Sequence, residues 1–140
     1  MSDLAVTASQ VVAGVAGTET FETLYAGEAI AVGEGYYQLA ADLKAYRALN
    51  DTAVHAALRG ICVAGAAGAG QKMVGQRNMS LTLGSGAAPA VGTPYFVSAN
   101  AGKFCPVGDL GSGVYVSLAG FGDAVNALKF GINNTGIAHA

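Results

Sequence analysis

Charged side chains are scarce in this chain of 140 residues. Asp, Glu, Lys and Arg together make up 11% of it, whereas about 25% is usual in soluble domains. Hydrophobic residues make up 52%. Such a chain has little charge with which to solvate the whole surface of a monomer. We therefore expect an exterior of small, weakly polar side chains, a surface partly covered by a partner, or both.

No excess of basic charge is present either. Seven Lys and Arg residues stand against nine Asp and Glu residues, which gives a formal net charge of −2 at pH 7. The basic residues occur singly along the sequence, whereas nucleic-acid-binding proteins usually carry a basic patch or stripe. These features predict that nucleic acid is not the main partner.

The sequence also lacks a recognisable export or membrane-spanning segment. Val11–Ala16 is not preceded by the basic region that opens a signal peptide. The longest run without a charge, Asn78–Gly102, contains two prolines and several glycines, so it does not suit a helix that crosses about 30 Å of hydrocarbon. We expect no membrane partner and synthesis in the cytoplasm of the producing cell.

Cysteine and histidine are rare. Cys62 and Cys105 are too few and too far apart to form a disulfide framework. We expect two buried, unpaired side chains, and a single bridge is the alternative. No Cys-x-x-Cys, His-x-x-x-His or acidic calcium loop occurs, so the sequence predicts no metal site.

Motifs of catalysis and of nucleotide binding are missing as well. Gly84-Ser85-Gly86 and Gly111-Ser112-Gly113 lack the spacing of a nucleophile turn. Gly65–Lys72 superficially resembles a phosphate-binding loop, but a glutamine separates its last glycine from the lysine, and methionine replaces the hydroxyl residue. The sequence therefore predicts no catalytic residues, no cofactor-binding residues, no cofactor and no enzyme activity.

The chain begins with a segment that has almost no large side chains. Residues 1–20 are mainly Ala, Val, Gly, Thr and Ser, and Leu4 is the one bulky aliphatic residue there besides the valines. We expect an extended N-terminal arm, either disordered or ordered by lying on a neighbour. Residues 21–140 are predicted to form a single β domain.

Short apolar segments between turn residues fill this domain, with the spacing of a sandwich or a barrel. The predicted strands are 22–25, 29–32, 36–40, 45–49, 58–64, 72–76, 79–83, 94–98, 103–107, 114–119 and 128–132. We expect hairpins from 72–76 with 79–83 and from 94–98 with 103–107, a helical turn over 53–57 and a late turn at 133–136. A longer helix over 40–57 is the alternative. The fold class is all-β, a small β-barrel or β-sandwich of short antiparallel strands with an extended N-terminal arm.

Large side chains stand out against this alanine-rich and glycine-rich background. Neighbouring strand residues point to opposite faces, so one of Tyr36 and Tyr37 can fill the core while the other points outward. An outward tyrosine is a common interface anchor, and coverage of both within the domain is the alternative. The candidate protein-contact residues are Leu4, Val6, Val11, Val12, Tyr36, Tyr37 and Phe121.

Three segments carry a resemblance to a known family: Gly27–Ile30, Arg59–Val63 and Gly92–Ala99. The pattern continues through Ala101-Gly102, Pro106, Asp109-Leu110, Ser112-Gly113, Val116, Leu118 and Leu128–Phe130. Over roughly residues 22–136, the chain resembles the small head-decoration, or capsid cement, domains of tailed bacteriophages. These motifs are rich in glycine and alanine and concern the fold.

The resemblance implies a β-barrel or β-sandwich unit on the outside of the mature head. It implies symmetric clusters, with a trimer favoured, that bridge neighbouring subunits of the major capsid protein, and it supplies no functional residues. We therefore expect a non-enzymatic virion structural protein on the capsid surface, made in the host cytoplasm, whose arm orders on the shell. A phage fibre, spike or other virion module is the first alternative, and a small-ligand-binding β-barrel is the second.

Overall fold

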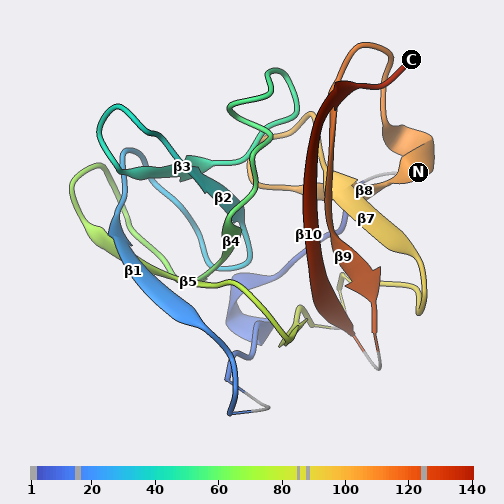
Figure 1. The fold of residues 1–140 in the computed structure, drawn as a ribbon. Coiled ribbons are helices and arrows are strands. Elements are labelled where there is room, and N and C mark those ends of the chain that lie inside the picture. Colours follow the sequence, from blue (N-terminus) through green and yellow to red (C-terminus); the bar gives the residue numbers. More distant parts are fainter. Residues whose placement is uncertain (1–2, 15–16, 85, 88, 124–125) are drawn as a thin grey trace.

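Two five-stranded antiparallel sheets form the protein (Figure 1). The computed structural model describes the chain except for residues 1–2, 15–16, 85, 88 and 124–125. Among the described residues there is no α-helix, and only two short 3-10 turns occur, η1 (Ala8–Gln10) and η2 (Val107–Asp109). The all-β prediction is confirmed, and the two sheets stay separate, as in a sandwich, and do not close into one barrel.

The first sheet has the strand order β1-β5-β4-β2-β3. Its strands are β1 (Phe21–Tyr25), β2 (Gly35–Gln38), β3 (Ala45–Arg47), β4 (Gly60–Ala64) and β5 (Lys72–Gln76). The sheet curls, and an isolated bridge between Ala26 and Ala45 joins its two edges at one end. One of its faces carries a hydrophobic cluster that includes Ile30, Tyr36 and Met73.

The second sheet has the order β6-β10-β9-β7-β8. Its strands are β6 (Ser80–Thr82), β7 (Pro94–Val97), β8 (Phe104–Pro106), β9 (Tyr115–Gly122) and β10 (Ala127–Ala138). The long strand β10 pairs with β6 and with β9. Its register on β9 shifts between Phe130 and Asn133 and again between Asn134 and Ala138, as at β-bulges, which increase the local bend and twist of a strand.

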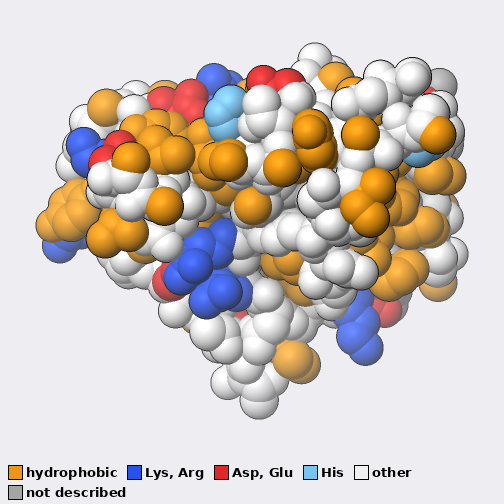
Figure 2. Space-filling view, turned by 45° about the horizontal axis from the view of Figure 1, so that its top comes forward, with side chains coloured by type: hydrophobic (Ala, Val, Ile, Leu, Met, Phe, Trp, Pro, Cys, Tyr) orange, Lys and Arg blue, Asp and Glu red, His pale blue; other side chains and the backbone are white. Residues whose placement is uncertain are grey.

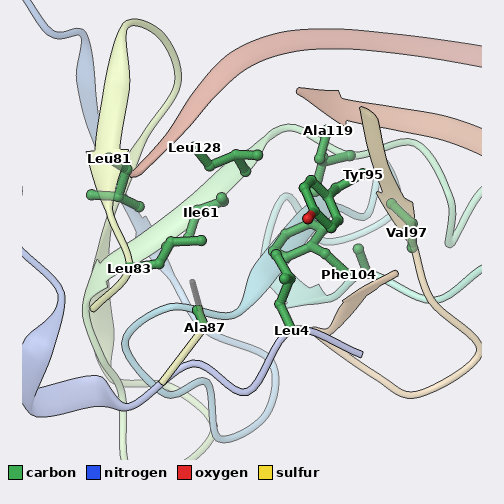
Figure 3. Packing of buried hydrophobic residues seen from close by; sticks show 12 residues of the cluster. Leu4, Ile61, Leu81, Leu83, Ala87, Tyr95, Val97, Phe104, Ala119 and Leu128 are labelled. Carbon is green, nitrogen blue, oxygen red and sulfur yellow. The ribbon is translucent and has the colours of Figure 1, made fainter. Parts of the chain in front are cut away.

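The larger hydrophobic cluster packs the two sheets together (Figure 3). Ile61 of β4 belongs to it together with Leu81 of β6 and Leu128 of β10, and all three are fully buried. The next residue, Cys62, belongs instead to the cluster on the other face of the first sheet. This split follows from the strand geometry, because consecutive side chains point to opposite faces.

Both cysteines are buried and unpaired, as the sequence predicts. Burial raises the pKa of the Cys62 thiol and of the Cys105 thiol to about 11. Each therefore stays protonated near neutral pH and packs as a small apolar side chain.

Most predicted strands are present, and the hairpin from 94–98 and 103–107 is confirmed as β7 and β8. The hairpin from 72–76 and 79–83 is wrong, because β5 pairs with β1 and β4 whereas β6 pairs with β10. Between them the chain turns into the second sheet. Met79 has a φ of 68°, and the Gln76 amide donates to the carbonyls of Asn78 and Ser80 at 2.9 and 3.0 Å.

Three further local predictions need correction. Residues 29–32 make only an isolated bridge, from Ile30 to Ala66. Residues 133–136 lie inside β10, where the Asn134 side-chain amide donates to the Leu58 carbonyl at 2.9 Å. The longer helix over 40–57 does not form, because Leu43 has a φ of 59°, in the left-handed region, and β3 follows it.

The described part of the N-terminal arm lies on its own domain. Leu4 is buried in the cluster between the sheets, and its N–H donates to the Phe104 carbonyl at 2.8 Å. Val12 forms a bridge with the edge strand β6. The structure thus differs from the expectation of an arm in 1–20 that is disordered or held by a neighbour, because an apolar site on this chain accepts Leu4.

We predict that Leu4→Ala lowers the free energy of unfolding by about 2–5 kcal/mol, because it empties a buried site. Val12→Ala is the matched control, since that side chain is 50% exposed, and a change within about 0.5 kcal/mol is expected. Urea denaturation measures both. Equal stabilities of the two variants would show that the arm is not part of the fold.

Candidate interaction surface

The seven predicted contact residues do not gather in one place. Leu4 and Tyr36 are buried in different hydrophobic clusters. Tyr37 is 7% exposed; its ring stacks on the Tyr46 ring at 5.8 Å between centroids and lies tilted against the His55 ring at 5.3 Å. In this fold the chain itself covers these three side chains, which for Tyr36 and Tyr37 is the alternative stated above.

The other four predicted residues lie nearer the surface. Val6 and Val11 are half-buried against the cluster between the sheets. Val12 and Phe121 are exposed, Phe121 by 44%. The Phe121 ring lies over Gly131 of the neighbouring strand, where a Cβ would be 3.5 Å from it. Val12 and Phe121 therefore remain available to a partner.

A partly apolar surface that the sequence reasoning missed lies on β1 and β5. Phe21, Thr23 and Tyr25 point to the same side, and Phe21 and Tyr25 are 45% and 54% exposed. On β5, Val74 lies opposite Thr23 and Lys72 lies opposite Tyr25, with the Lys72 ammonium 5.9 Å from the Tyr25 ring centroid. We call these five residues the β1–β5 face.

The strand β1 is also the edge of its sheet, with β5 as its only strand partner among the described residues. An edge strand presents unpaired backbone groups to which another chain can add. The signal in the sequence is the spacing of two between Phe21, Thr23 and Tyr25, but a period of two does not say which face is buried. Here the buried face is the one that carries Glu22 and Leu24.

The hydrogen-bond and charge partners of the Glu22 carboxylate explain why the face of β1 that carries Glu22 can point inward. The Tyr36 ring of β2 crosses β4 and β5, and its hydroxyl donates to Glu22 Oε2 on β1 at 2.6 Å. Arg59 Nε donates to the two oxygens of Glu22 at 2.9 and 2.7 Å. Arg77 Nε lies 3.7 Å from Oε2. The buried end of Glu22 is therefore hydrogen-bonded and paired with positive charge.

Two glycines make room for the crossing tyrosine. A Cβ at Gly75 would overlap the Tyr36 hydroxyl, and a Cβ at Gly60 would lie 2.8 Å from the same oxygen. A larger residue at Gly75 therefore meets the ring itself, and one at Gly60 also meets the Gln76 carbonyl oxygen, 2.6 Å away. The sequence shows two glycines in predicted strands, but it does not show which ring lies on them.

The ionisation of this group follows from its surroundings. Burial raises the pKa of Glu22, but hydrogen bonds from Arg59 and Tyr36, together with the charges of Arg59 and Arg77, lower it more, so the pKa lies below its ordinary value. Burial and then the bond to Glu22 raise the pKa of Tyr36, which keeps its proton and stays a donor. One carboxylate thus faces two guanidinium groups, and one positive charge is left over.

The two arginines line a pair of adjoining hollows of about 440 and 320 Å³. Leu58 and Asn134 are common to both hollows, and the Asn134 bond to the Leu58 carbonyl ties the second sheet to the first at this point. Figure 2 shows a group of basic side chains within a hollow of the surface. We call the two adjoining hollows together the arginine hollow.

The histidines make ordinary local contacts. His55 Nδ1 lies 2.7 Å from Asp51 Oδ1, and His139 Nδ1 lies 3.0 Å from the Gly111 carbonyl oxygen. No cluster of three or more His, Cys, Asp or Glu placed to hold a metal ion is found in the part of the chain that the structure describes. Nor does that part contain a helix of the length and hydropathy needed to span a membrane.

Comparison with known proteins gives no further assignment. No family model, no curated protein and no solved structure matches this chain. The function is therefore argued from the residues and their arrangement.

We predict that Glu22→Gln lowers the free energy of unfolding at pH 7 by about 1–3 kcal/mol, the usual cost of losing hydrogen bonds to a charged group. Because the folded pKa of Glu22 is depressed, its contribution is present above its ordinary value of 4.5 and is lost as the pH falls through the folded value. The gap between wild type and variant should therefore close below pH 4.5.

Denaturation curves at several pH values measure this gap. Glu28→Gln is the control. Glu28 pairs with the Arg47 guanidinium at 3.3 Å with more than a third of each side chain exposed, and a glutamine oxygen can still accept the 2.9 Å hydrogen bond from the Arg47 backbone N–H, so this substitution should cost less. A difference in the free energy of unfolding that stays constant down to the pH at which the protein unfolds in acid would contradict the role assigned to Glu22.

Proposed function

We propose that the protein is a non-enzymatic structural component of a bacteriophage virion, which binds the outer surface of the mature head and stabilises it. Its partner is the major capsid protein, and it acts in symmetric clusters, with a trimer favoured. The observation that carries the proposal is the exposed β1–β5 face on an edge strand of a β-sandwich. The low charge of the chain agrees with a surface partly covered by a partner, one of the two expectations drawn from the composition.

The segments that resemble cement domains support the proposal through the fold. Gly60 lies under the Tyr36 ring, and Ile61 fills the cluster between the sheets. Gly27 lies against the Tyr46 ring, and Tyr95 of β7 is buried. These residues form the core and turns of the domain. We therefore expect other, exposed side chains to contact the capsid.

The β1–β5 face offers enough apolar surface to matter for binding. Covering the exposed halves of Phe21 and Tyr25 removes on the order of 200 Å² from water, or about 5 kcal/mol before the entropy cost of association. Binding to the expanded lattice alone stabilises that state by mass action. Modest contacts, repeated when a cluster binds several capsid subunits, add through multivalency.

Co-sedimentation with expanded, undecorated heads of the parent phage tests the proposal. We expect saturable binding at a fixed ratio per capsid subunit and none to unexpanded proheads. The double variant Phe21→Ser with Tyr25→Ser should bind at least tenfold more weakly, a difference of about 1.4 kcal/mol. Leu43→Ser is the matched control, since Leu43 is an exposed leucine outside this face.

Absence of binding to heads would overturn the capsid role. Undiminished binding by the double variant would remove the β1–β5 face from the contact. Deletion of the arm is not a suitable test, because Leu4 is part of the core.

A further inference from the structure

The arginine hollow holds hydrogen-bond donors that the fold leaves unused. Arg59 binds Glu22 through Nε alone. Its terminal nitrogens, and the whole guanidinium of Arg77, donate no hydrogen bond to the described residues, and Arg77 only approaches Glu22 at 3.7 Å. The side chains of Arg59 and Arg77 are 34% and 41% exposed. Both forks are therefore accessible from solvent.

The rest of the hollow favours an anion. Its other lining residues are neutral: Thr20, Gln38, Ala57, Leu58, Asn78, Ile132 and Asn134. Among the described residues, no carboxylate lines either part of it. Glu22 lies behind the arginines with 15% of its side chain exposed and offsets one of their two charges. One positive charge remains to face an incoming group.

The chemistry of the walls indicates which anion fits. A guanidinium fork matches a planar carboxylate with two parallel hydrogen bonds. Leu58, Ile132 and Ala57 give the hollow an apolar wall beside these donors. The methylene groups of a glutamate or aspartate side chain can pack on such a wall, whereas inorganic phosphate has no apolar part to use it.

We propose that the arginine hollow is a binding site for the carboxylate of an acidic side chain on a protein partner. Arg77 directly follows β5, and its backbone N–H donates to the Thr20 carbonyl at 2.9 Å, so the hollow borders the start of β1, where Phe21 lies. The hollow lies on the side of β1 that carries Glu22, whereas the β1–β5 face is on the other side of that strand, so the two sites adjoin at the start of β1. That this partner is the capsid protein rests on the proposed function, whereas the carboxylate site does not.

Amide shifts in NMR spectra at low ionic strength test the site with two blocked tripeptides, Ala-Glu-Ala and Ala-Gln-Ala. The glutamyl peptide should shift the amides of Arg59, Arg77 and Asn134 saturably, and the glutaminyl peptide should not. Arg77→Gln should weaken the binding at least tenfold, about 1.4 kcal/mol. Arg77 is suited to substitution, because its side chain donates no hydrogen bond within the described fold. Lys129→Gln, on the exposed side of β10, should change nothing.

Inorganic phosphate is titrated as a third probe. Three outcomes would overturn the carboxylate site: no amide shift with the glutamyl peptide, equal shifts with both peptides, or shifts of the same amides with inorganic phosphate instead of the glutamyl peptide. Head binding by the wild type is measured separately. If the heads bind the protein but the glutamyl peptide does not, the carboxylate site is wrong and the capsid role stands. Peptide binding without head binding would remove the capsid role and leave the site.

Discussion

The hydrogen bond from the Tyr36 hydroxyl to the Glu22 carboxylate is the constraint on which the first sheet depends. It reaches from β2 to β1 across the two strands between them, and it requires glycine at the crossing points. Because Glu22 faces inward, Phe21 and Tyr25 on the same strand face solvent. The same carboxylate holds Arg59, so the exposed apolar face and the arginine hollow are both consequences of one buried polar contact.

These two surfaces border each other on a domain held by two separate hydrophobic clusters. The pairing of an apolar face with a small charged site suits recognition of a folded protein surface, since buried apolar anchors supply affinity and a charge pair fixes orientation. It suits the proposed capsid role, in which the protein must tell one state of a lattice from another. The edge strand β1 also offers backbone groups to which a neighbouring chain can add.

Sequence reasoning found what local signals encode. The all-β class follows from the spacing of turns, and the β7–β8 hairpin follows from the turn at Ala99–Gly102. Sequence reasoning failed where residues far apart in the chain determine which side chains are buried. The burial of Leu4 depends on a site formed by the β-sheets, and the Glu22 contacts join residues 14 and 37 positions apart. A strand at 22–25 is predicted from the sequence, but the direction of its buried face depends on Tyr36 and Arg59, which no local pattern links to it.

The most direct test of this account is the free energy of unfolding of Gly75→Ala. At a position with open space, replacing glycine by alanine stabilises a protein by about 0.4–1 kcal/mol through the unfolded state. Gly68→Ala provides that reference, because no atom lies within 4 Å of its Cβ position. At Gly75 the added methyl group meets the Tyr36 ring, and we predict a loss of about 1–3 kcal/mol. A Gly75→Ala protein as stable as Gly68→Ala would show that Tyr36 does not cross β5 to reach Glu22.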